Sequence, residues 1–523
     1  MVDKCIFLLD IFKIFCKYIS MSICFKSIIL HREKDYFMKY IGTRNPNIIS
    51  EASKAVLKGI CEDGGLFMPD KIPTMDKSLE ELVNLSYQEL AYEVMKLYMN
   101  DYTEDELKYC INNAYDSKFD TDVIAPLVKQ NDVSILELFH GRTLAFKDMA
   151  LSILPYLMKT AAKKNGIDKE IVILTATSGD TGKAALEGFA DVEGTRIMVF
   201  FPEDGVSPVQ KLQMVTQEGK NTCVVGIKGN FDDAQSAVKS IFTDPELIKE
   251  LDDKGFMFSS ANSINIGRLV PQVVYYFYAY MQMVRSGEIK LGEKINFTVP
   301  TGNFGNILAG YYAKCMGLPV NKFICASNDN KVLYDFFKTG TYDKNREFMV
   351  TVSPSMDILI SSNLERLLCK LTSPEKTKEL MASLAKEGKY SVDIKNDEIV
   401  GEFATKDETF KAIKDMYEKT GYVLDTHTAV AYAAYEKYKV ETKDETKTVI
   451  VSTASPYKFT KDVLCAIDSK YESGDALELM TELENISKVS IPEPIKGIES
   501  RPVLHNNVCE KDGIKNFVRE KLN

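Results

Sequence analysis

The 523-residue chain has no tryptophan and only four histidines, and its eleven cysteines are scattered. No Cys-x-x-Cys pair occurs, and the histidines lie far apart in the sequence. Zinc fingers and ribbons need paired Cys or His ligands at short spacing, so the sequence excludes these sites and we expect no metal centre. Scattered cysteines in a chain of this length are typical of reduced thiols, which predicts a cytoplasmic protein.

A basic surface and a long uncharged apolar run are also missing. The 75 Asp and Glu residues outnumber the 65 Lys and Arg residues, which gives a formal net charge of −10. Nucleic-acid binding depends on a basic surface that neutralises phosphates, so this charge argues against a nucleic-acid partner. A membrane-spanning helix needs about 20 nearly uncharged apolar residues, and charges interrupt the apolar stretch Cys5–Leu30. We therefore expect no membrane partner.

The patterning divides the chain into four parts. Residues 1–37 are rich in Ile, Phe and Cys and are expected to be an extension outside the fold. A targeting segment and a structural role stay open for them. Residues 38–120 are predicted to form a helical N-terminal domain, and residues 121–480 an α/β region with two lobes. Residues 481–523 are expected to be a C-terminal segment.

Strands and helices alternate from Val133 onward, which predicts parallel sheets covered by helices on both faces. Helices are also expected over Ile48–Lys58 and Leu79–Met99, where apolar residues recur at helical spacing. The charged stretch Glu365–Tyr435 is expected to be a largely helical peripheral layer. The runs expected to be strands are Val133–Leu138, Ile171–Thr177, Arg196–Phe201, Asn221–Ile227, Ile295–Pro300, Lys322–Ser327 and Thr448–Ala454.

Two of these strands run into glycine-rich loops that precede helices. The loop Ser178-Gly-Asp-Thr-Gly182 follows the strand Ile171–Thr177, and the loop Thr301-Gly-Asn-Phe-Gly-Asn306 follows the strand Ile295–Pro300. Such a loop presents backbone N–H groups and the positive end of a helix dipole, which favours an anion. A P-loop is excluded because two residues, not four, separate Gly179 from Gly182. Asp180 disfavours an anion, so we expect it to cap the helix or to bond within the loop.

A lysine and a hydroxyl cluster complete the set. Lys147 stands at the start of an apolar helix, where a cation costs about 0.3–1 kcal/mol against the dipole. Partial burial would lower its pKa further and make the amine a nucleophile, whereas an exposed lysine is the alternative. Ser452, Thr453 and Ser455 end the last strand. An activated lysine, a phosphate-binding loop and a hydroxyl for a ring nitrogen together suit pyridoxal phosphate.

The chain contains six motifs in order: Tyr40–Asn45, Glu62–Phe67, Leu144–Asp148, Ala176–Gly182, Ser260–Asn265 with Gly267-Arg268, and Gly302–Asn306. Together they resemble the threonine synthase family, which contains pyridoxal-phosphate enzymes of fold type II, the tryptophan synthase β-like fold. The resemblance covers nearly the whole chain after Met38. Two positions depart from it: Arg142 stands where the family usually has Pro, and Ser455 where a His commonly precedes Pro456.

The resemblance implies a role for each motif. Lys147 would be the catalytic residue and would bind the cofactor aldehyde, and Thr453 would face the pyridine nitrogen. The implied reaction converts O-phospho-L-homoserine and water to L-threonine and phosphate, so the expected partner is a small phosphorylated amino acid. A monomer or a homodimer is expected. The cofactor phosphate would lie against Gly302, Asn303, Phe304, Gly305 and Asn306, and the substrate against Ser178, Asp180, Thr181, Asn262 and Arg268.

Three alternatives differ in class. One is another fold type II lyase, such as a threonine dehydratase-like enzyme, and the second anion loop argues against it. Another is a threonine-synthase-like binding protein without catalysis, and the intact Lys147 and Thr453 argue against it. A nucleotide-binding protein is disfavoured by the loop spacing. His140 and His427 are expected to be hydrogen-bonded structural residues, and Asp425–Thr428 to cap a helix.

Overall fold

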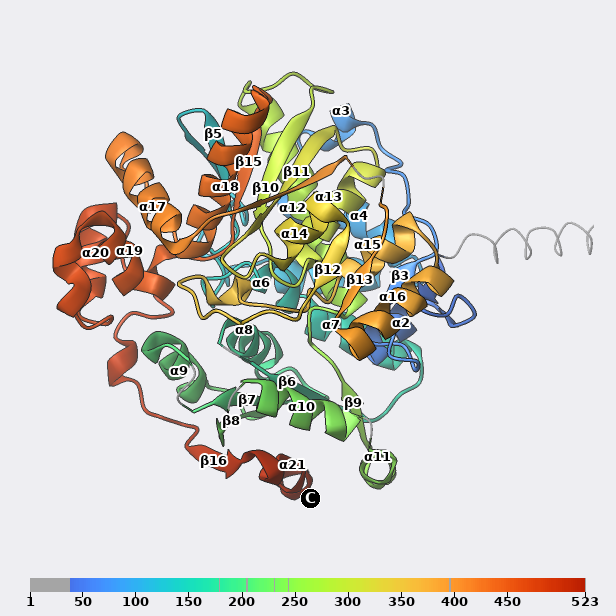
Figure 1. The fold of residues 1–523 in the computed structure, drawn as a ribbon. Coiled ribbons are helices and arrows are strands. Elements are labelled where there is room, and N and C mark those ends of the chain that lie inside the picture. The colour runs from blue at the N-terminus through green and yellow to red at the C-terminus, as the bar shows by residue number, and fades with distance from the viewer. Residues whose placement is uncertain are drawn as a thin grey trace, which may run out of the picture.

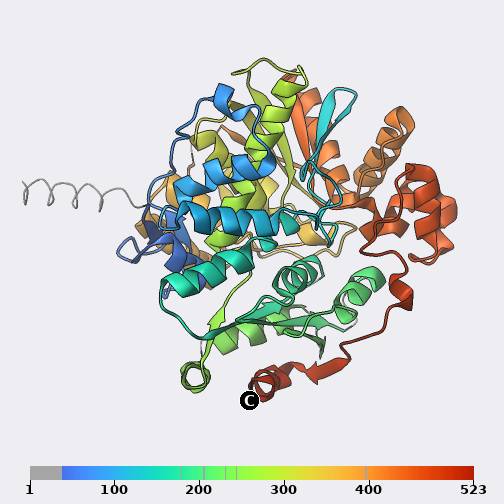
Figure 2. The same ribbon diagram turned by 180° about the vertical axis from the view of Figure 1, so that it is seen from behind.

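The computed structural model describes residues 38–177, 179–203, 206–229, 231–242, 244–394 and 397–522. The expected extension 1–37 and Ser178 lie outside the described residues. Two largely parallel sheets form two lobes, and the N-terminal helices pack behind the upper one in the view of Figure 1 (Figures 1 and 2). The predicted class, parallel sheets flanked by helices with a helical N-terminal region, is confirmed.

The first lobe contains a six-stranded sheet with the order β14-β11-β10-β15-β5-β4. Every neighbouring pair is parallel except β4 and β5. Along β15, Val449 and Val451 face one core cluster while Ile450 faces another, so both faces of the sheet are buried. The strands are β4 (Leu127–Gln130), β5 (Val133–Glu137), β10 (Ile295–Pro300), β11 (Val320–Ser327), β14 (Ile399–Phe403) and β15 (Thr448–Ser452).

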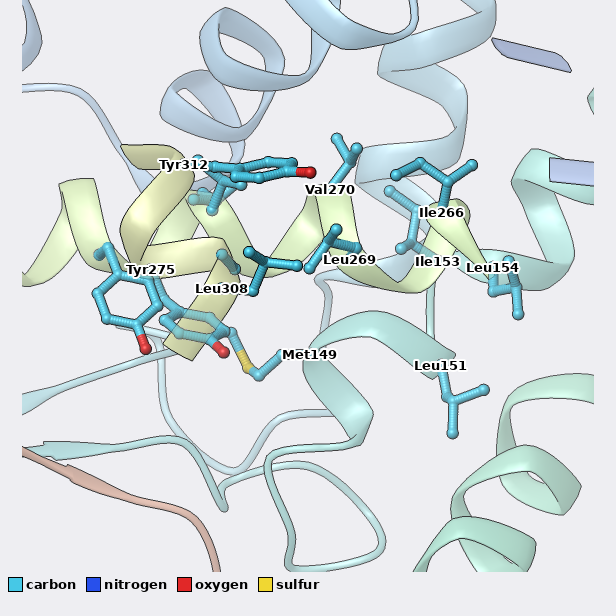
Figure 3. Packing of buried hydrophobic residues seen from close by; sticks show 14 of the residues in the cluster. Met149, Leu151, Ile153, Leu154, Ile266, Leu269, Val270, Tyr275, Leu308 and Tyr312 are labelled. Atoms are coloured by element: carbon cyan, nitrogen blue, oxygen red, sulfur yellow. The ribbon is translucent and has the colours of Figure 1, made fainter. Parts of the chain in front are cut away.

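Helices cover both faces of this sheet. Helix α18 (Thr426–Thr442) packs along β10, β11, β14 and β15 on one face. On the other, Tyr276 of α12 (Ile266–Arg285) meets the ring of Phe297 edge to face, with the ring centroids 4.9 Å apart. Helix α13 (Gly305–Cys315) lies beside α12, and Leu308 and Tyr312 pack against it (Figure 3). Helix α12 has buried residues on all its sides, because it lies in the centre of the core.

The second lobe contains a five-stranded parallel sheet with the order β16-β8-β7-β6-β9. Helix α8 (Asp180–Phe189) packs against β7 on one face, and α10 (Phe231–Phe242) packs on the other. The chain's C-terminal segment supplies both β16 and α21 (Ile514–Lys521) to this lobe (Figure 1). The strands are β6 (Glu170–Ala176), β7 (Thr195–Pro202), β8 (Thr222–Lys228), β9 (Phe256–Ser259) and β16 (Asn507–Glu510).

The N-terminal region packs on the same core as α12. Three helices there begin with a capping box, in which the side chains of Ser78, Ser86 and Thr103 bond the N3 backbone. The cap at Ser86 divides the expected helix Leu79–Met99 into two helices. The expected helix Ile48–Lys58 also starts late, because Ile49–Ser50 pairs with Tyr40–Ile41 as a strand. The elements are β1 (Tyr40–Gly42), β2 (Ile49–Ser50), α2 (Ala52–Lys58), β3 (Phe67–Pro69), α3 (Leu79–Leu82), α4 (Tyr87–Tyr98) and α5 (Glu104–Ala114).

The expectation of a helical peripheral layer over Glu365–Tyr435 is wrong in two respects. The stretch contains β14, which pairs with β11 in the main sheet, and the first half of α18, which is buried. Strand β14 reads Ile-Val-Gly-Glu-Phe, so its glycine and glutamate obscured the apolar pattern. Helix α15 (Leu364–Leu371) is mostly buried as well, and the helices that do cover the surface there are α16 (Pro374–Glu387) and α17 (Lys406–Thr420).

The remaining elements connect the two lobes or cover their surfaces. No helix among the described residues combines the length and the apolar character needed to cross a bilayer. These elements are α6 (Asp148–Leu151), α7 (Leu154–Lys164), α9 (Pro208–Val215), α11 (Pro245–Asp253), α14 (Val332–Thr339), β12 (Thr341–Asp343), β13 (Lys389–Ser391), α19 (Thr460–Ile467), α20 (Leu479–Ser487) and short 3₁₀ turns, among them η1 (Pro354–Met356) and η2 (Pro456–Phe459).

Candidate active site

Lys147 lies between the two lobes, in the loop that joins β5 to α6. Its Nζ donates to Ser355 Oγ at 3.2 Å and lies 4.0 Å from Asp180 Oδ2, and its side chain is 12% exposed. Burial lowers the pKa of Lys147 to about 8, and the charges of Arg268 and Lys458 add to this effect against the opposing carboxylate of Asp180. Lys147 is therefore a buried amine at a helix start and not the exposed lysine of the alternative.

The loop that carries Lys147 is fixed to the end of β15. Phe146 N–H donates to the carbonyl of Thr453 at 2.8 Å, and Ala145 forms a bridge with Ala454. The hydroxyls of Ser452 and Ser455 are hydrogen-bonded within the protein: that of Ser452 to the hydroxyl of Thr428, and that of Ser455 to the N–H of Tyr457, which donates to it. Among the described residues, the hydroxyl of Thr453 has no such partner. Thr453 is thus the member of the predicted cluster that lies beside Lys147 with a hydroxyl left for a ligand.

The second predicted loop, Gly302–Asn306, follows β10, the neighbour of β15. Gly302 permits a close approach, because a Cβ there would lie 2.5 Å from the carbonyl oxygen of Ser355. Phe304 takes a left-handed conformation (φ 64°), and its ring is buried. Gly305 begins α13, whose N-terminus faces the loop. Asn303 is exposed and accepts from Ser362 Oγ at 3.2 Å.

Asn306 provides the test of whether a phosphate group fits this loop. Its Oδ1 accepts from the hydroxyls of Tyr275 and Tyr276, both at 2.7 Å, so the amide orientation is fixed. Its Nδ2 is buried and has no partner among the described residues. An orphaned buried donor costs about 1–3 kcal/mol, and an anion at the loop would remove that cost. The loop therefore fits the cofactor phosphate that the sequence assigns to it.

The first predicted loop is closed by its own threonine. Thr177 Oγ1 accepts from the backbone N–H groups of Gly179 and Gly182, at 3.0 and 2.9 Å. Two donors that the pattern offered to an anion are therefore occupied. Thr181 is half-buried in the first turn of α8. This loop retains its position opposite Lys147 but presents fewer N–H groups than predicted.

The expectation that Asp180 caps the helix or bonds within its loop is wrong, because its partners come from distant segments. Its Oδ1 accepts from Lys458 Nζ at 2.8 Å and from Gln210 Nε2 at 3.0 Å. Its Oδ2 accepts from Ser355 Oγ at 3.3 Å. Burial alone would raise the pKa of Asp180, but the ammonium groups of Lys458 and Lys147 outweigh burial and hold that pKa well below its usual range.

Ser355 and Lys458 were not identified from the sequence. Ser355 lies in the short 3₁₀ turn η1, which no apolar periodicity marks in the sequence. Lys458 follows the hydroxyl cluster after β15, and this proximity in the chain was its only signal. His427 contacts this group as well, because its Nε2 accepts the N–H of Ser355 at 3.1 Å. The proton of the neutral ring is thus on Nδ1, 3.2 Å from Asp425 Oδ1. Asp425 caps α18 as predicted.

Arg268 and Asn262 lie at the start of α12. The guanidinium of Arg268 is 3% exposed, and one Nη donates to the carbonyl of Ala261 at 2.9 Å. Its Nε has no partner among the described residues, and burial lowers its pKa to about 10. A buried guanidinium with an unused donor fits an anionic ligand. Asn262 is half-buried, and its N–H donates to Ser260 Oγ at 3.2 Å.

Arg142 and His140, which were also named from the sequence, lie outside the group around Lys147. Arg142 is more than half exposed and pairs with Glu187 at 3.1 Å. His140 bonds Asp120 at 2.5 Å and Glu137 at 2.9 Å, which agrees with the predicted hydrogen-bonded role. The described residues hold no cluster of His, Cys, Asp and Glu that suits a metal ion.

Comparison with known proteins agrees with this geometry. Family profiles match in chain order: Threonine synthase N terminus over residues 39–115, Pyridoxal-phosphate dependent enzyme over 124–454, and Threonine synthase, C-terminal over 428–518. Threonine synthase from Schizosaccharomyces pombe is 38% identical over 470 residues, which covers 83% of this chain and 90% of that protein. The chain belongs to the threonine synthase family. Pyridoxal phosphate is therefore its cofactor, and it is an enzyme of this type.

Two further relatives extend the comparison. Threonine synthase-like 1 from Homo sapiens is 40% identical over 440 residues, which covers 80% of this chain but 58% of that longer protein. The crystal structure of PLP-bound threonine synthase from Brucella melitensis superimposes with a TM-score of 0.82 at 34% identity. It covers 92% of this chain and 99% of that one. The fold and the cofactor expected from the six motifs are thus confirmed.

Proposed function

We propose that this enzyme converts O-phospho-L-homoserine and water to L-threonine and phosphate. The observation that carries the proposal is the buried amine of Lys147, which lies where loops of both lobes converge. Membership of the threonine synthase family supports the same reaction. The substrate is a small phosphorylated amino acid, so the site must accommodate a carboxylate and a phosphate in addition to the cofactor.

The cofactor would be held at three places in the first lobe. Residues Gly302–Asn306 would bind its phosphate, Thr453 its pyridine nitrogen and Lys147 its aldehyde. Pyridoxal phosphate, when bound, stores the electron pair released when a bond to the substrate Cα breaks. A hydroxyl partner such as Thr453, unlike a carboxylate, does not favour a proton on the pyridine nitrogen.

Lys147 would move the protons of the reaction. Once the substrate is in place, the amine of Lys147 would take the proton from Cα and then one from Cβ, and phosphate would leave from Cγ. Lys147 would return the two protons, one to Cγ, which becomes the methyl group, and one to Cα. Water would supply the hydroxyl at Cβ and the proton of the released phosphate. A pKa of about 8 suits this role, because both protonation states are populated near neutral pH. Ser355, 3.2 Å from Nζ, orients the amine.

Substrate anions would bind opposite Lys147. Arg268 offers a buried guanidinium whose Nε has no partner in the part of the chain that the structure describes, and Asn262 lies in the loop that precedes the same helix. Thr181 and Ser178 would contribute from the loop of the second lobe. Both oxygens of Asp180 accept from protein groups, so we assign Asp180 to Lys147 and not to the substrate.

The test is production of threonine and phosphate from O-phospho-L-homoserine by the purified enzyme. We expect equal amounts of both products, and no threonine from Lys147→Ala. Phosphate without threonine would indicate an eliminase, and 2-oxobutanoate from L-threonine would indicate a dehydratase-like enzyme. A yellow protein that turns over neither substrate would favour the binding-protein alternative. Arg268→Met is expected to raise KM for the substrate more than it alters the visible spectrum of the bound cofactor.

We also propose that the enzyme is cytoplasmic and is a monomer or a homodimer. The eight cysteines of the described residues are free thiols, which supports a reducing compartment. No second chain is needed to complete the group around Lys147, since its members come from one chain. Light scattering of the purified protein distinguishes the two oligomeric states.

A further inference from the structure

Lys458 is a charged residue without any exposed side-chain surface. It lies in η2, the element that follows β15 in the chain, and its side chain is 0% exposed. A buried ammonium is costly even when it is paired, and apolar replacements of such pairs are often as stable. Stability is therefore a weak reason for a lysine here, and its contacts point to another role.

The contacts of Lys458 join the two lobes behind Lys147. Its Nζ bonds Asp180 Oδ1 at 2.8 Å, the carbonyl of Thr143 at 2.8 Å and Gln213 Oε1 at 3.3 Å. Thr143 belongs to the loop that leads to Lys147, whereas Asp180 and Gln213 belong to α8 and α9 of the second lobe. One ammonium thus fixes a residue of each lobe in place.

The two oxygens of Asp180 face different groups as a result. Oδ1 is occupied by Lys458 and Gln210, which leaves Oδ2 directed at Ser355 Oγ and, 4.0 Å away, at Lys147 Nζ. Because the Ser355 hydroxyl donates to Oδ2, the lone pairs of its oxygen are available to accept from Lys147. The chain of contacts therefore runs from Lys458 through Asp180 and Ser355 to the reacting amine.

We propose that Lys458 is a positioning residue: it holds Asp180 ionised and turned so that Asp180 and Ser355 orient the amine of Lys147. The proposal rests on the reaction proposed above. Asp180 acts as a fixed charge and does not accept the proton of Lys147, since its pKa lies far below the value of about 8 for that amine. No proton transfer to Asp180 is required.

The charged groups around Lys147 give this role a measurable sign. Asp180 and Asp148 raise the pKa of Lys147, whereas Arg268 and Lys458 lower it. Removing Asp180's charge must therefore lower that pKa, and removing the charge of Lys458 must raise it. If Lys458 and Asp180 only filled space, replacing them would not shift the pKa of Lys147 in opposite directions.

The experiment titrates the visible absorbance of the bound cofactor with pH in the holoenzyme, because this absorbance responds to protonation at the nitrogen of Lys147. In Lys458→Met we expect the midpoint to rise by about one pH unit, and in Asp180→Asn to fall by about one unit. We expect kcat for threonine formation to fall about 10–100-fold in Lys458→Met, because the amine is misplaced, with KM changed less.

Lys183→Met is the matched control. Like Lys458, Lys183 is a buried lysine in an ion pair, but it lies in α8. It pairs with Glu187 at 2.9 Å and donates to the side chain of Gln217. It does not contact Lys147, Ser355 or Asp180 among the described residues. We expect its substitution to leave the spectroscopic midpoint within about 0.2 units of the wild type, a shift far smaller than a nearby charge produces.

Two outcomes would overturn the proposal. One is a midpoint in Lys458→Met that matches the Lys183→Met control, and the other is unchanged kcat. If Lys458→Met does not fold, the double variant Asp180→Asn/Lys458→Met removes both charges and decides the question, because retention of wild-type kcat contradicts the proposal. If the wild type makes no threonine, the proposed reaction fails, while the opposite spectroscopic shifts still test Lys458.

Discussion

Buried charges in this enzyme fall into two kinds, those with partners and those without. Asp180 and Lys458 form a pair that is nearly inaccessible to solvent, whereas Arg268 has no carboxylate partner within the described part of the chain and its Nε has no acceptor there. A protein does not retain an unpaired buried charge for stability, because its desolvation is not offset. The guanidinium of Arg268 is therefore the group we propose for an anionic ligand, and the Asp180–Lys458 pair is the one we propose to position Lys147.

The first prediction concerns the stability of that pair. Lys458→Met leaves a buried carboxylate without its ammonium and should lower the free energy of unfolding by about 3–5 kcal/mol. The double variant Asp180→Asn/Lys458→Met replaces the pair by neutral groups of similar size and should recover most of this loss. Urea unfolding at pH 7.5 measures both. Equal destabilisation in the single and double variants would show that the ion pair is not the cause.

The second prediction concerns pH. Burial alone would lower the pKa of His140, but hydrogen bonds to Asp120 and Glu137 raise it to about 9. Because the folded pKa exceeds the unfolded value, the stabilisation is complete below about pH 6.5 and is lost as the pH rises through 9. His140→Gln should therefore be less stable than wild type at pH 6, by about 1–3 kcal/mol given the exposure of Asp120, and nearly equal above pH 9.5. Unfolding curves at both pH values check this, and a constant difference would contradict it.

At the scale of elements, the site is assembled by the ends of neighbouring strands. Strands β5, β15 and β10 are adjacent in the sheet, so the loops after them bring Lys147, Thr453 and Gly302 together. Loops at the carboxyl ends of parallel strands are the usual position of ligands in open α/β sheets. A glycine is needed at position 302 because the backbone of Ser355 lies so close to it that a side chain would not fit.

The third prediction tests the close contact between Gly302 and Ser355. Gly302→Ala would place a methyl group 2.5 Å from the Ser355 carbonyl oxygen and must displace the turn η1, which carries Ser355. We expect cofactor affinity to fall about tenfold or more, as displacement of an anion-binding backbone costs at least one charge-assisted hydrogen bond of about 1.5–3 kcal/mol. Absorbance titration with pyridoxal phosphate measures the affinity. Gly513→Ala, where the nearest atom would be 3.8 Å away, is the control, and an equal effect there would contradict the steric cause.

At the scale of the whole molecule, the last residues of the chain complete the second lobe. Strand β16 pairs with β8, and Ile514 and Val518 of α21 join the core cluster beneath the sheet. The chain reaches this position after passing α20 and α9 at the side of the molecule (Figure 1). A segment far from Lys147 in sequence therefore stabilises the sheet that holds Asp180.

The fourth prediction follows from this packing. Ile514→Ala removes a fully buried side chain and should lower the free energy of unfolding by about 2–5 kcal/mol. Val508→Ala changes a side chain of the same segment that is 47% exposed, and it should cost much less. Thermal and urea unfolding compare the two. Similar small losses in both variants would show that the C-terminal segment contributes little to the lobe.

The amino-acid sequence by itself determined most local features. Helix caps at Ser86 and Asp425 depend on residues within three positions, and the alternation in β15 reflects neighbours in the chain. The motifs around Lys147 and Gly302–Asn306 likewise lie within short segments. Such features are readable because the interactions that produce them are local.

Only the tertiary structure decided which groups surround the reacting amine. Ser355 is 208 residues from Lys147, and Lys458 is 315 residues from Thr143, so no spacing in the chain predicts that they meet. The lowered pKa of Lys147 also depends on burial between the lobes. Electrostatic effects act through space and through the exclusion of water, and the folded chain alone fixes both.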